Sequence, residues 1–245
     1  MPFIKISFLF ILVGWALIAS RISSADTLSF NTTSSPPLST PDQDGYEDRL
    51  IIEALRRVGH DVKISFLPGE RSLMNLNNGV DDGTHVRIAG IESTYRNIIP
   101  VSEKITNWHF VAFTRRTDIK IEKFSDLEPY DVAFMNGWKI FENDVSKARS
   151  ITKANKPEQL FRLLGRGRTD VILYERWSGR KLARDLGMEE VREVSPPLAV
   201  KEMFIYLHKR HKGIVGELGR ALKKMKSDGT YEKIFQVTLA PLKQD

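Results

Sequence analysis

Val80-Asp81-Asp82-Gly83-Thr84-His85-Val86-Arg87-Ile88-Ala89-Gly90 reads as a short strand that follows a helix ending at Gly79. Its glycines let another backbone or a ligand come close to the strand. Arg87 has two interpretations: it binds an anionic group, or it lies on a solvated strand edge and pairs with Asp81 or Asp82. The rest of the chain has to decide between them.

Strands and helices alternate on both sides of this segment. One helix, predicted over residues 46–58, repeats apolar side chains at the spacing of a single buried face, namely Leu50, Ile51, Ala54, Leu55 and Val58. Other helices are predicted over residues 70–76, 139–145, 157–164, 175–186, 214–225 and 231–237. Strands are predicted over residues 28–33, 61–67, 97–101, 108–113, 131–135, 150–152, 169–174, 191–194 and 203–207. This alternation is typical of a parallel α/β sheet.

The alternation of strands and helices is interrupted at two strands, residues 108–113 and 203–207, and resumes after each of them. The simplest arrangement has the chain crossing to a second lobe after the first of these strands and returning at the second. We therefore expect one lobe from residues 26–113 and 203–245, and another from residues 114–202. A ligand would lie between the lobes, at the carboxyl ends of the strands.

The N-terminal residues 1–25 match a secretory signal peptide. A short basic region around Lys5 precedes an apolar run from Ile6 to Ala19, which is too short to cross a bilayer, and small residues follow at Ser23 and Ala25. The chain contains no cysteine, so disulfides and thiolate sites are excluded. With 245 residues and 41% hydrophobic content, an exported globule without disulfides fits a Gram-negative periplasm.

Several functional classes are not expected. The formal charge of +6 is dispersed, and the densest basic cluster, residues 209–212, has no interleaved aromatic residues, so we expect no nucleic-acid partner. The five histidines show no metal-ligand spacing, and we expect no metal and no cofactor. Serine-hydrolase and phosphate-loop motifs are also absent from the sequence.

The order of motifs resembles the family 3 extracellular solute-binding proteins, the periplasmic amino-acid-binding type. Residues 45–55 resemble the first helix of that family, and residues 67–79 resemble its second helix with the glycine after it. Residues 170–173 are similar to a family strand that precedes an acidic residue, and residues 222–235 to the family's C-terminal ending. The resemblance covers nearly all of the mature chain. It implies an α/β, two-lobe periplasmic-binding-protein-like (type II) fold with a hinged interlobe cleft.

The resemblance also implies site residues. The family holds a ligand carboxylate with an arginine, a role that falls on Arg87 or Arg96, and we favour Arg87 because its neighbours are apolar or glycine. In the second lobe, Gly137 matches a family Gly-Thr turn in which Trp138 replaces the threonine. The acid for a ligand ammonium group falls on Glu175 in place of the usual aspartate.

Two further residues are candidates from their own placement. Arg71 lies in the first turn of a helix, where a cation opposes the helix dipole and a role other than helix stability is indicated. His85 is the histidine nearest the expected cleft, although it also fits a satisfied strand histidine. Two of the earlier candidates have structural alternatives as well: Glu175 as a helix cap and Trp138 as a core or surface aromatic residue.

We therefore expect a monomeric binding module, not an enzyme, that captures a small polar or charged molecule, either amino-acid-like or an organic anion. Its partner would be an inner-membrane ABC-transporter permease or a membrane sensor. One alternative is a dehydratase-like enzyme on the same scaffold, with Glu175 or His85 as the general acid or base. Another is a ligand-free module that acts through protein contacts.

Overall fold

The computed structural model describes residues 26–145 and 147–243. The expected signal peptide, residues 1–25, lies outside these described residues. Within them, no helix has both the length and the apolar character needed to cross a membrane.

The first lobe is built on a mixed sheet whose strands follow the order β2-β1-β3-β9. Its strands are β1 (Thr27–Thr32), β2 (Asp61–Phe66), β3 (Gly83–Arg87), β4 (Ile98–Pro100) and the C-terminal part of β9 (Arg192–His208). Its helices are α1 (Tyr46–Arg56), α2 (Gly69–Asn77), α6 (Lys212–Ser227) and α7 (Thr230–Thr238). β1 pairs in parallel with β2 and β3, whereas β3 and β4 pair with β9 in antiparallel fashion. The apolar face of α1 is buried against this sheet, as its periodicity predicts.

The second lobe is built on the strand order β9-β5-β8-β6-β7. Its further strands are β5 (Thr106–Thr114), β6 (Asp131–Met135), β7 (Ser150–Ala154) and β8 (Val171–Glu175). Its helices are α3 (Lys139–Asp144), α4 (Pro157–Gly165) and α5 (Arg176–Asp185). β6 pairs in parallel with both β7 and β8, so the α/β alternation read from the sequence forms a parallel core here as well.

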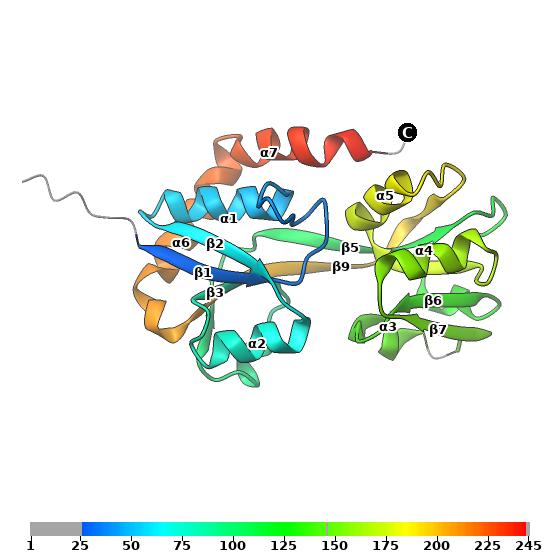
Figure 1. The fold of residues 1–245 in the computed structure, drawn as a ribbon, viewed down its shortest axis with the longest axis horizontal. Helices are drawn as coiled ribbons and strands as arrows, with labels where there is room; N and C mark the ends of the chain where they lie inside the picture. The colour runs from blue at the N-terminus through cyan, green and yellow to red at the C-terminus, as the bar shows by residue number, and fades with distance from the viewer. Residues whose placement is uncertain (1–25, 146, 244–245) are drawn as a thin grey trace, which may run out of the picture.

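Two long antiparallel strands, β5 and β9, run between the lobes (Figure 1). The sequence suggested two separate strands, residues 191–194 and 203–207, interrupted by Pro196 and Pro197. That prediction was wrong, because β9 is one strand of 17 residues. The pairing with β5 shifts register, so that residues 195–198 bulge out between the pairs Ala112–Val194 and Phe110–Ala199. Both prolines sit in this bulge, where the ladder does not need the amide hydrogen that proline lacks.

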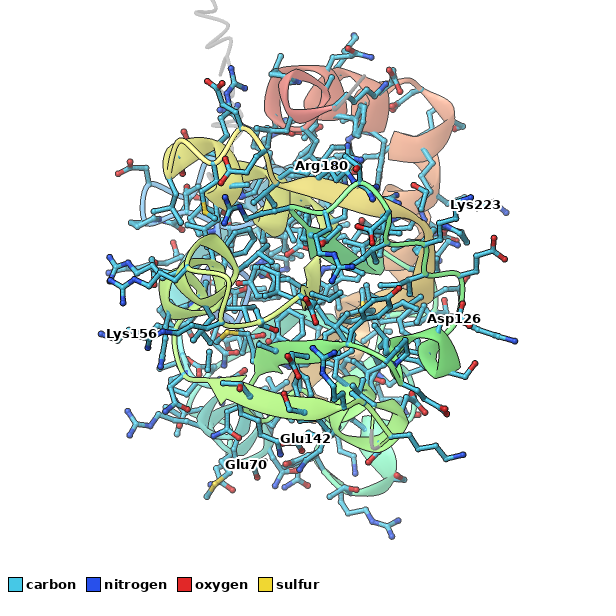
Figure 2. The ribbon with its side chains drawn as sticks, turned by 90° about the vertical axis from the view of Figure 1, so that its right-hand side faces the viewer. Glu70, Asp126, Glu142, Lys156, Arg180 and Lys223 are labelled. Carbon is cyan, nitrogen blue, oxygen red and sulfur yellow. The ribbon has the colours of Figure 1, made fainter. Side chains whose placement is uncertain are left out.

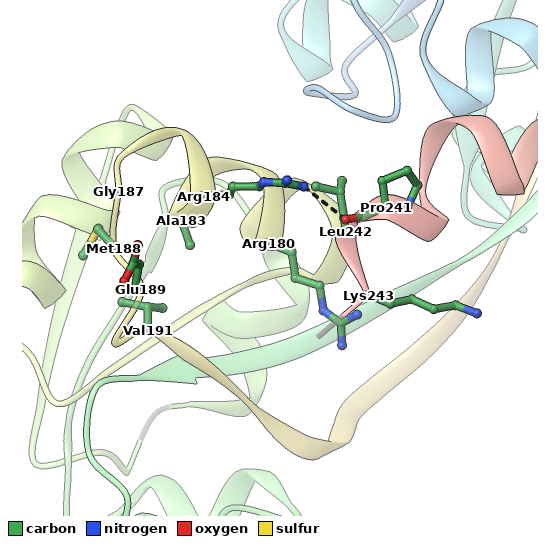
Figure 3. A pocket seen from close by; sticks show the side chains of 10 residues that line it. All are labelled: Arg180, Ala183, Arg184, Gly187, Met188, Glu189, Val191, Pro241, Leu242 and Lys243. Carbon is green, nitrogen blue, oxygen red and sulfur yellow. Dashed lines mark hydrogen bonds between the residues drawn. The ribbon is translucent and has the colours of Figure 1, made fainter. Parts of the chain in front are cut away.

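The C-terminal segment leaves the first lobe and ends on the second (Figures 1 and 3). After α7, a 3-10 turn (Ala240–Leu242) packs near α5, where Arg184 donates a hydrogen bond of 3.1 Å to the carbonyl of Pro241. Phe235 of α7 makes an edge contact with Trp177 of α5 at a centroid distance of 5.6 Å. The end of the chain therefore forms a third connection between the lobes, beside β5 and β9.

α2 of the first lobe and α3 of the second lobe lie on the same side of the molecule (Figure 1). Figure 2 views the second lobe end-on and places Glu70 of α2 and Glu142 of α3 toward the same side of the molecule, in agreement with Figure 1. The lobe boundaries that we expect at residues 113–114 and 202–203 fall within β5 and β9.

Candidate functional site

Arg87 ends β3 and turns its guanidinium toward hydroxyl groups. Its Nη1 donates a hydrogen bond of 2.7 Å to Thr33 Oγ1, and its Nη2 donates to Ser72 Oγ. Its Nε is buried and has no hydrogen-bond partner among the described residues. Burial lowers the pKa of Arg87 to about 10, and no carboxylate in the described part of the chain forms an ion pair with it. A largely buried cation that contacts only hydroxyls is a candidate anion site.

The pair between Arg87 and Asp81 or Asp82, which the sequence left open, does not form. Asp81 accepts a hydrogen bond of 2.7 Å from Asn31, and Asp82 pairs with Arg210 and with His211. Both carboxylates are therefore engaged elsewhere. The interpretation of Arg87 as a solvated, ion-paired edge residue is wrong.

The backbone before Arg87 is strained. Val86 has a φ of 71°, in the left-handed region that a β-branched residue rarely adopts, and the pairing of β3 with β9 shifts register between Thr84 and Arg87. Such a conformation costs about 1–3 kcal/mol and persists where surrounding packing enforces it. Here the Val86 side chain is buried in the core of the first lobe. The irregular backbone thus lies directly before Arg87, which still pairs with Phe204 of β9.

Glu47, in the first turn of α1, is a second titratable group of the site. It is fully buried; its Oε2 accepts a hydrogen bond of 2.5 Å from Ser34 Oγ, and its Oε1 accepts one of 2.7 Å from the indole of Trp108. Burial raises the pKa of Glu47 to about 8, although these two hydrogen bonds oppose the shift. Arg87 and Glu47 interact electrostatically without forming an ion pair.

Glu175 approaches from the second lobe, at the end of β8. Its Oε2 accepts a hydrogen bond of 2.8 Å from the backbone amide of Ser178, so the interpretation of Glu175 as the cap of α5 is confirmed. Its Oε1 is buried and has no hydrogen-bond partner in the described ranges. Burial raises the pKa of Glu175 to about 7. The cap thus uses one oxygen and leaves the other for a further role.

Ser35 links the two lobes beside these acids. Its hydroxyl lies 3.5 Å from the hydroxyl of Tyr174, and its carbonyl accepts a hydrogen bond of 3.3 Å from Ser178 Oγ. Because Ser35 follows β1 whereas Tyr174 and Ser178 flank Glu175, the loop that precedes α1 touches the start of α5. These contacts bring Glu47 and Glu175 into the same region.

A stacked aromatic pair divides this region. The ring of Trp138 stacks on that of Tyr174 with a centroid distance of 5.0 Å and an interplanar angle of 12°. Phe141 stacks on the same indole with a centroid distance of 5.8 Å and an interplanar angle of 19°. The ring centroid of Trp138 also lies 6.3 Å from that of Trp108, whose indole donates the hydrogen bond to Glu47. The substitution that the sequence analysis noted, tryptophan for threonine, therefore builds an aromatic wall.

Two hollows flank this wall. One, of about 430 Å³, is lined by residues of both lobes that include Ile88, Trp108, Phe110 and Trp138. The other, of about 470 Å³, lies on the Tyr174 side and includes Ser34, Phe66 and Ser178. Glu47 is hydrogen-bonded from both, through Trp108 and through Ser34. Arg87, Glu47 and Glu175 do not line either hollow, but Glu47 contacts one lining residue of each, and both hollows have the size of a small-molecule site.

Arg96, Arg71 and Gly137 form no hydrogen bond or ion pair with this cluster in the described part of the chain, whereas His85 interacts electrostatically with Arg87. Arg96 is exposed, on the loop before β4, and Arg71 is exposed on α2 next to Ser72. Gly137 adopts a φ of 81° on the exposed turn before α3, where its amide donates a 3.3 Å hydrogen bond to Glu142. His85 is buried in the first lobe, 3.8 Å from Asp48, and burial lowers its pKa to about 3, which keeps it neutral.

Sequence reasoning missed Glu47, although the chain carried a signal for it. Glu47 precedes Leu50, Ile51 and Ala54 by three, four and seven residues, so it shares the buried face of α1. An acid on the apolar face of a helix has to meet a partner within the protein. Ser34 and Trp108 are those partners.

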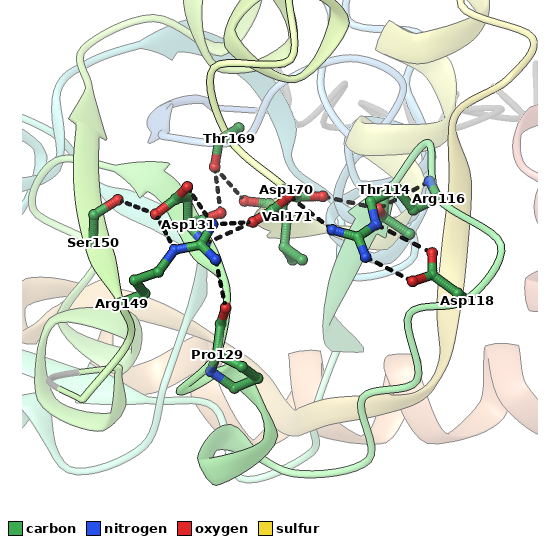
Figure 4. A network of polar contacts seen from close by, with 10 residues as sticks. All are labelled: Thr114, Arg116, Asp118, Pro129, Asp131, Arg149, Ser150, Thr169, Asp170 and Val171. Carbon is green, nitrogen blue, oxygen red and sulfur yellow. Dashed lines mark hydrogen bonds and ion pairs between the residues drawn. The ribbon is translucent and has the colours of Figure 1, made fainter.

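A second cluster of acids and arginines lies at the far ends of β6 and β8 (Figure 4). Arg149 donates to Asp131 and, at 2.8 Å, to Asp170, and Arg116 donates to Asp170 at 3.1 Å. Arg149 and Arg116 are about half exposed. Each charge here has an opposite partner, as expected of a structural network. In residues 26–145 and 147–243, no group of three or more His, Cys, Asp or Glu side chains is arranged to hold a metal ion.

The architecture is that of the type II periplasmic-binding-protein-like fold. No family model matches the chain. An uncharacterized protein of Shewanella oneidensis is 26% identical over 199 residues, which cover 78% of this chain and 75% of that protein.

Solved structures show the same fold at low sequence identity. The substrate-binding protein of an amino acid ABC transporter has a TM-score of 0.67 at 16% identity, covering 86% of this chain and 98% of that one. A histidine kinase sensor domain with similarity to periplasmic binding proteins reaches 0.70 at 17%, covering 89% and 96%. An ancestral amino-acid-binding protein, a precursor of cyclohexadienyl dehydratase, reaches 0.68 at 18%, covering 87% and 95%. The resemblance stated from the sequence is confirmed at the level of the fold.

Proposed function

We propose that the chain is an exported solute-binding protein of the periplasm that captures a small ligand with an anionic group between its two lobes. The observation that carries this proposal is the largely buried guanidinium of Arg87, which contacts hydroxyls and no carboxylate. Removing such a cation from water is unfavourable unless an anion compensates it. A ligand carboxylate supplies that anion and accepts from a guanidinium in bidentate fashion.

Closure of the lobes would follow from contacts on both sides of the cleft. Arg87 and Glu47 belong to the first lobe, and Glu175 and Trp138 to the second, with Gly137 at the turn before α3. A ligand that touches both sets binds the closed arrangement better and shifts the population toward it. The closed form would then be recognised by an ABC-transporter permease or by a membrane sensor, the two roles of the fold relatives described above.

Thermal unfolding in the presence of small molecules tests this proposal. A panel of amino acids, polyamines, organic acids and aromatic acids should contain a compound that raises the melting temperature, because a ligand of the folded form alone stabilises it. Arg87→Ala should weaken binding of that compound at least about 100-fold, by loss of a buried charge contact. Arg96→Ala, an exposed control, should leave the affinity unchanged. The reverse pattern would move the anion site to Arg96, and no shift with any compound would favour a module that acts through protein contacts.

A dehydratase-like enzyme on the same scaffold is the second candidate. The observation that favours it is the pair of buried carboxyl groups with pKa values raised to about 8 and about 7, a range that suits general acid or base catalysis. His85 fits this role less well, because it stays neutral in the core of the first lobe. Product analysis of each stabilising compound separates the candidates: release of water from the compound, lost in Glu175→Gln, would establish the enzyme.

A further inference from the structure

A further hollow, of about 340 Å³, lies behind the crossing strand β5, on the face away from the aromatic wall. Successive side chains of a strand point to opposite faces, and β5 pairs with β9 without a register shift from Thr106 to Phe110. Trp108 and Phe110 line the hollow beside the wall, whereas Asn107 and His109 line this one. α5 and α7 lie on one side of β5 and β9, and α2 and α3 on the other (Figure 1). The hollow is therefore separate from the interlobe site.

Both lobes contribute aromatic side chains to its lining. The first lobe supplies Tyr46 from α1 with Tyr231 and Phe235 from α7, and the second lobe supplies Trp177 from α5. Phe235 meets Tyr46 and Trp177 edge to face, at centroid distances of 6.4 Å and 5.6 Å. Aromatic rings in such contacts are stabilised beyond the burial of their area. Four rings around a hollow of small-molecule size therefore favour a flat ligand.

Three polar atoms on the lining side chains are buried and have no hydrogen-bond partner within residues 26–145 and 147–243. They are Asn107 Oδ1, His109 Nδ1 and the phenol oxygen of Tyr231. Nearly all buried polar atoms in proteins are paired, and an unpaired one destabilises the fold. A ligand in the hollow reaches these atoms through small rotations of the side chains that carry them. Three unpaired atoms on one lining thus indicate a ligand with hydrogen-bonding groups.

The amide oxygen of Asn107 defines which group the ligand has to carry. This oxygen only accepts hydrogen bonds, so its partner is an N–H or O–H donor. Burial, and after it the nearby Arg176, lowers the pKa of His109, so the imidazole is neutral at pH 7. The Nδ1 of a neutral imidazole and the hydroxyl of Tyr231 each donate or accept. A donor on the ligand is therefore the one fixed requirement.

The lysines that line this hollow already have partners. Lys104 forms an ion pair of 2.7 Å with Glu202. Lys226 pairs with Glu103 and donates a hydrogen bond to the carbonyl of Lys104. Neither lysine resembles Arg87, which contacts only hydroxyls, so neither calls for an anion. The ligand that suits this lining is neutral.

We propose that the hollow behind β5 is a second ligand site, which binds a neutral, planar heterocycle that carries an N–H group. The aromatic rings contact the heterocycle, and its N–H donates to Asn107 Oδ1. Because the lining comes from both lobes, the ligand bridges them on the rear face of the crossing strand. Arg87, Glu47 and Glu175 do not line this site. It goes beyond the proposed function and is independent of what the interlobe site binds.

Indole and 1-methylindole are matched probes, because they share a ring system and differ in the N–H donor. Isothermal titration calorimetry at pH 7 should give a dissociation constant below about 1 mM for indole. The constant for 1-methylindole should be at least about fivefold weaker, the loss expected for one hydrogen bond. The methyl group makes 1-methylindole the more hydrophobic probe, so a merely apolar hollow would give the opposite order. Absence of indole binding, or binding of 1-methylindole that is equal or tighter, would overturn the proposal.

Asn107→Leu tests the acceptor itself. Leucine has nearly the shape of asparagine but cannot accept a hydrogen bond, so this variant should lose the preference for indole. Asn78→Leu, the same change at an exposed position after α2, should keep the wild-type preference. Thermal melts establish that both variants are folded, and the two probes decide on the wild type alone if one of them is not. A preference that survives in folded Asn107→Leu would contradict the proposed site.

Nitrogen-15 NMR of the tryptophan indole groups locates the bound probe. Trp177 lines the hollow behind β5, and Trp138 lines the hollow on the other face. Indole should shift the N–H signal of Trp177 more than that of Trp138, and Trp177→Phe assigns the first signal. A larger shift of the Trp138 signal would place indole in the interlobe site, which would refute the second site and leave the proposed function intact.

Discussion

Two of the places where carboxyl groups lie near arginine differ in a way that separates a structural role from the functional role that we propose. At the far end of the second lobe, Arg149 and Arg116 pair directly with Asp131 and Asp170 in partly exposed positions. Between the lobes, Arg87 lies near Glu47 without pairing with it; the carboxyl group of Glu47 is buried, and Arg87 is largely buried. Compensated charges at the surface add little and need nothing more. Uncompensated charges in the interior reduce stability and call for a partner.

The largest expected effect is a gain of stability at Arg87. Arg87→Met replaces a largely buried, unpaired cation with an apolar side chain, which should raise the free energy of unfolding at pH 7 by about 1–3 kcal/mol. The hydrogen bonds from Arg87 to Thr33 and Ser72 are lost, and Ser72 keeps its hydrogen bond to Asn31. Denaturation in urea measures the change. A loss of stability would mean that Arg87 is already compensated within the protein.

The indole of Trp108 is expected to have the next largest effect. Trp108→Phe keeps an aromatic ring in the wall and removes the N–H that donates to Glu47 Oε1. Leaving a buried acceptor without its donor should lower the free energy of unfolding by about 1–2 kcal/mol. Because this hydrogen bond favours the ionised acid, the pKa of Glu47 should rise further above 8. Carbon-13 NMR of the Glu47 carboxyl group, followed against pH, would show an unchanged titration if the bond has no such role.

The two clusters should also respond to opposite ends of the pH scale. Hydrogen bonds from Arg149 and Ser150 lower the pKa of Asp131 to about 2, so its stabilisation is present above its ordinary value near 4 and is lost as the pH falls toward 2. Asp131→Asn should therefore melt below the wild type at pH 6 and match it at pH 2. Thermal melts of both proteins over this range make the comparison. A constant difference at every pH would show that protonation of Asp131 is not what changes.

The smallest effect is expected at Arg149. Arg149→Gln removes an exposed partner from Asp131 and Asp170, but Arg116 still pairs with Asp170 and Ser150 still donates to Asp131. The melting temperature should fall slightly, and the response to any ligand should match that of the wild type. A change in ligand affinity would show that the far cluster is connected to the cleft.

Most secondary structure followed from local periodicity, because a buried helix face and an α/β alternation are written in neighbouring residues. The continuity of β9 as a single strand did not follow from local periodicity. Pro196 and Pro197 argue locally for a break, and only the register of β5 reveals that four residues bulge out opposite Val111. The position of a bulge depends on the partner strand, which lies some 80 residues earlier in the sequence, so a local pattern does not contain it.

Some residues of the candidate site could be proposed from the sequence, and others could not. Arg87 and Glu175 became candidates through a family resemblance and through the apolar neighbours of Arg87. Glu47 was missed because an acid in the first turn of a helix usually has a satisfactory role at the surface. Its burial is decided by Ser34 and Trp108, which are 13 and 61 residues away in the sequence. Contacts over such separations appear only once the lobes are assembled.

The place of β9 in the sheet has a consequence for biosynthesis. In the order β2-β1-β3-β9-β5, the strand that completes the first lobe is the last one to be made, so β3 keeps an open edge until residues 203–208 have emerged. The second lobe is encoded between the two crossings and can complete its parallel strands earlier. A chain of this design carries an unfinished N-terminal half until residue 208 has been made, which prolongs its exposure to aggregation.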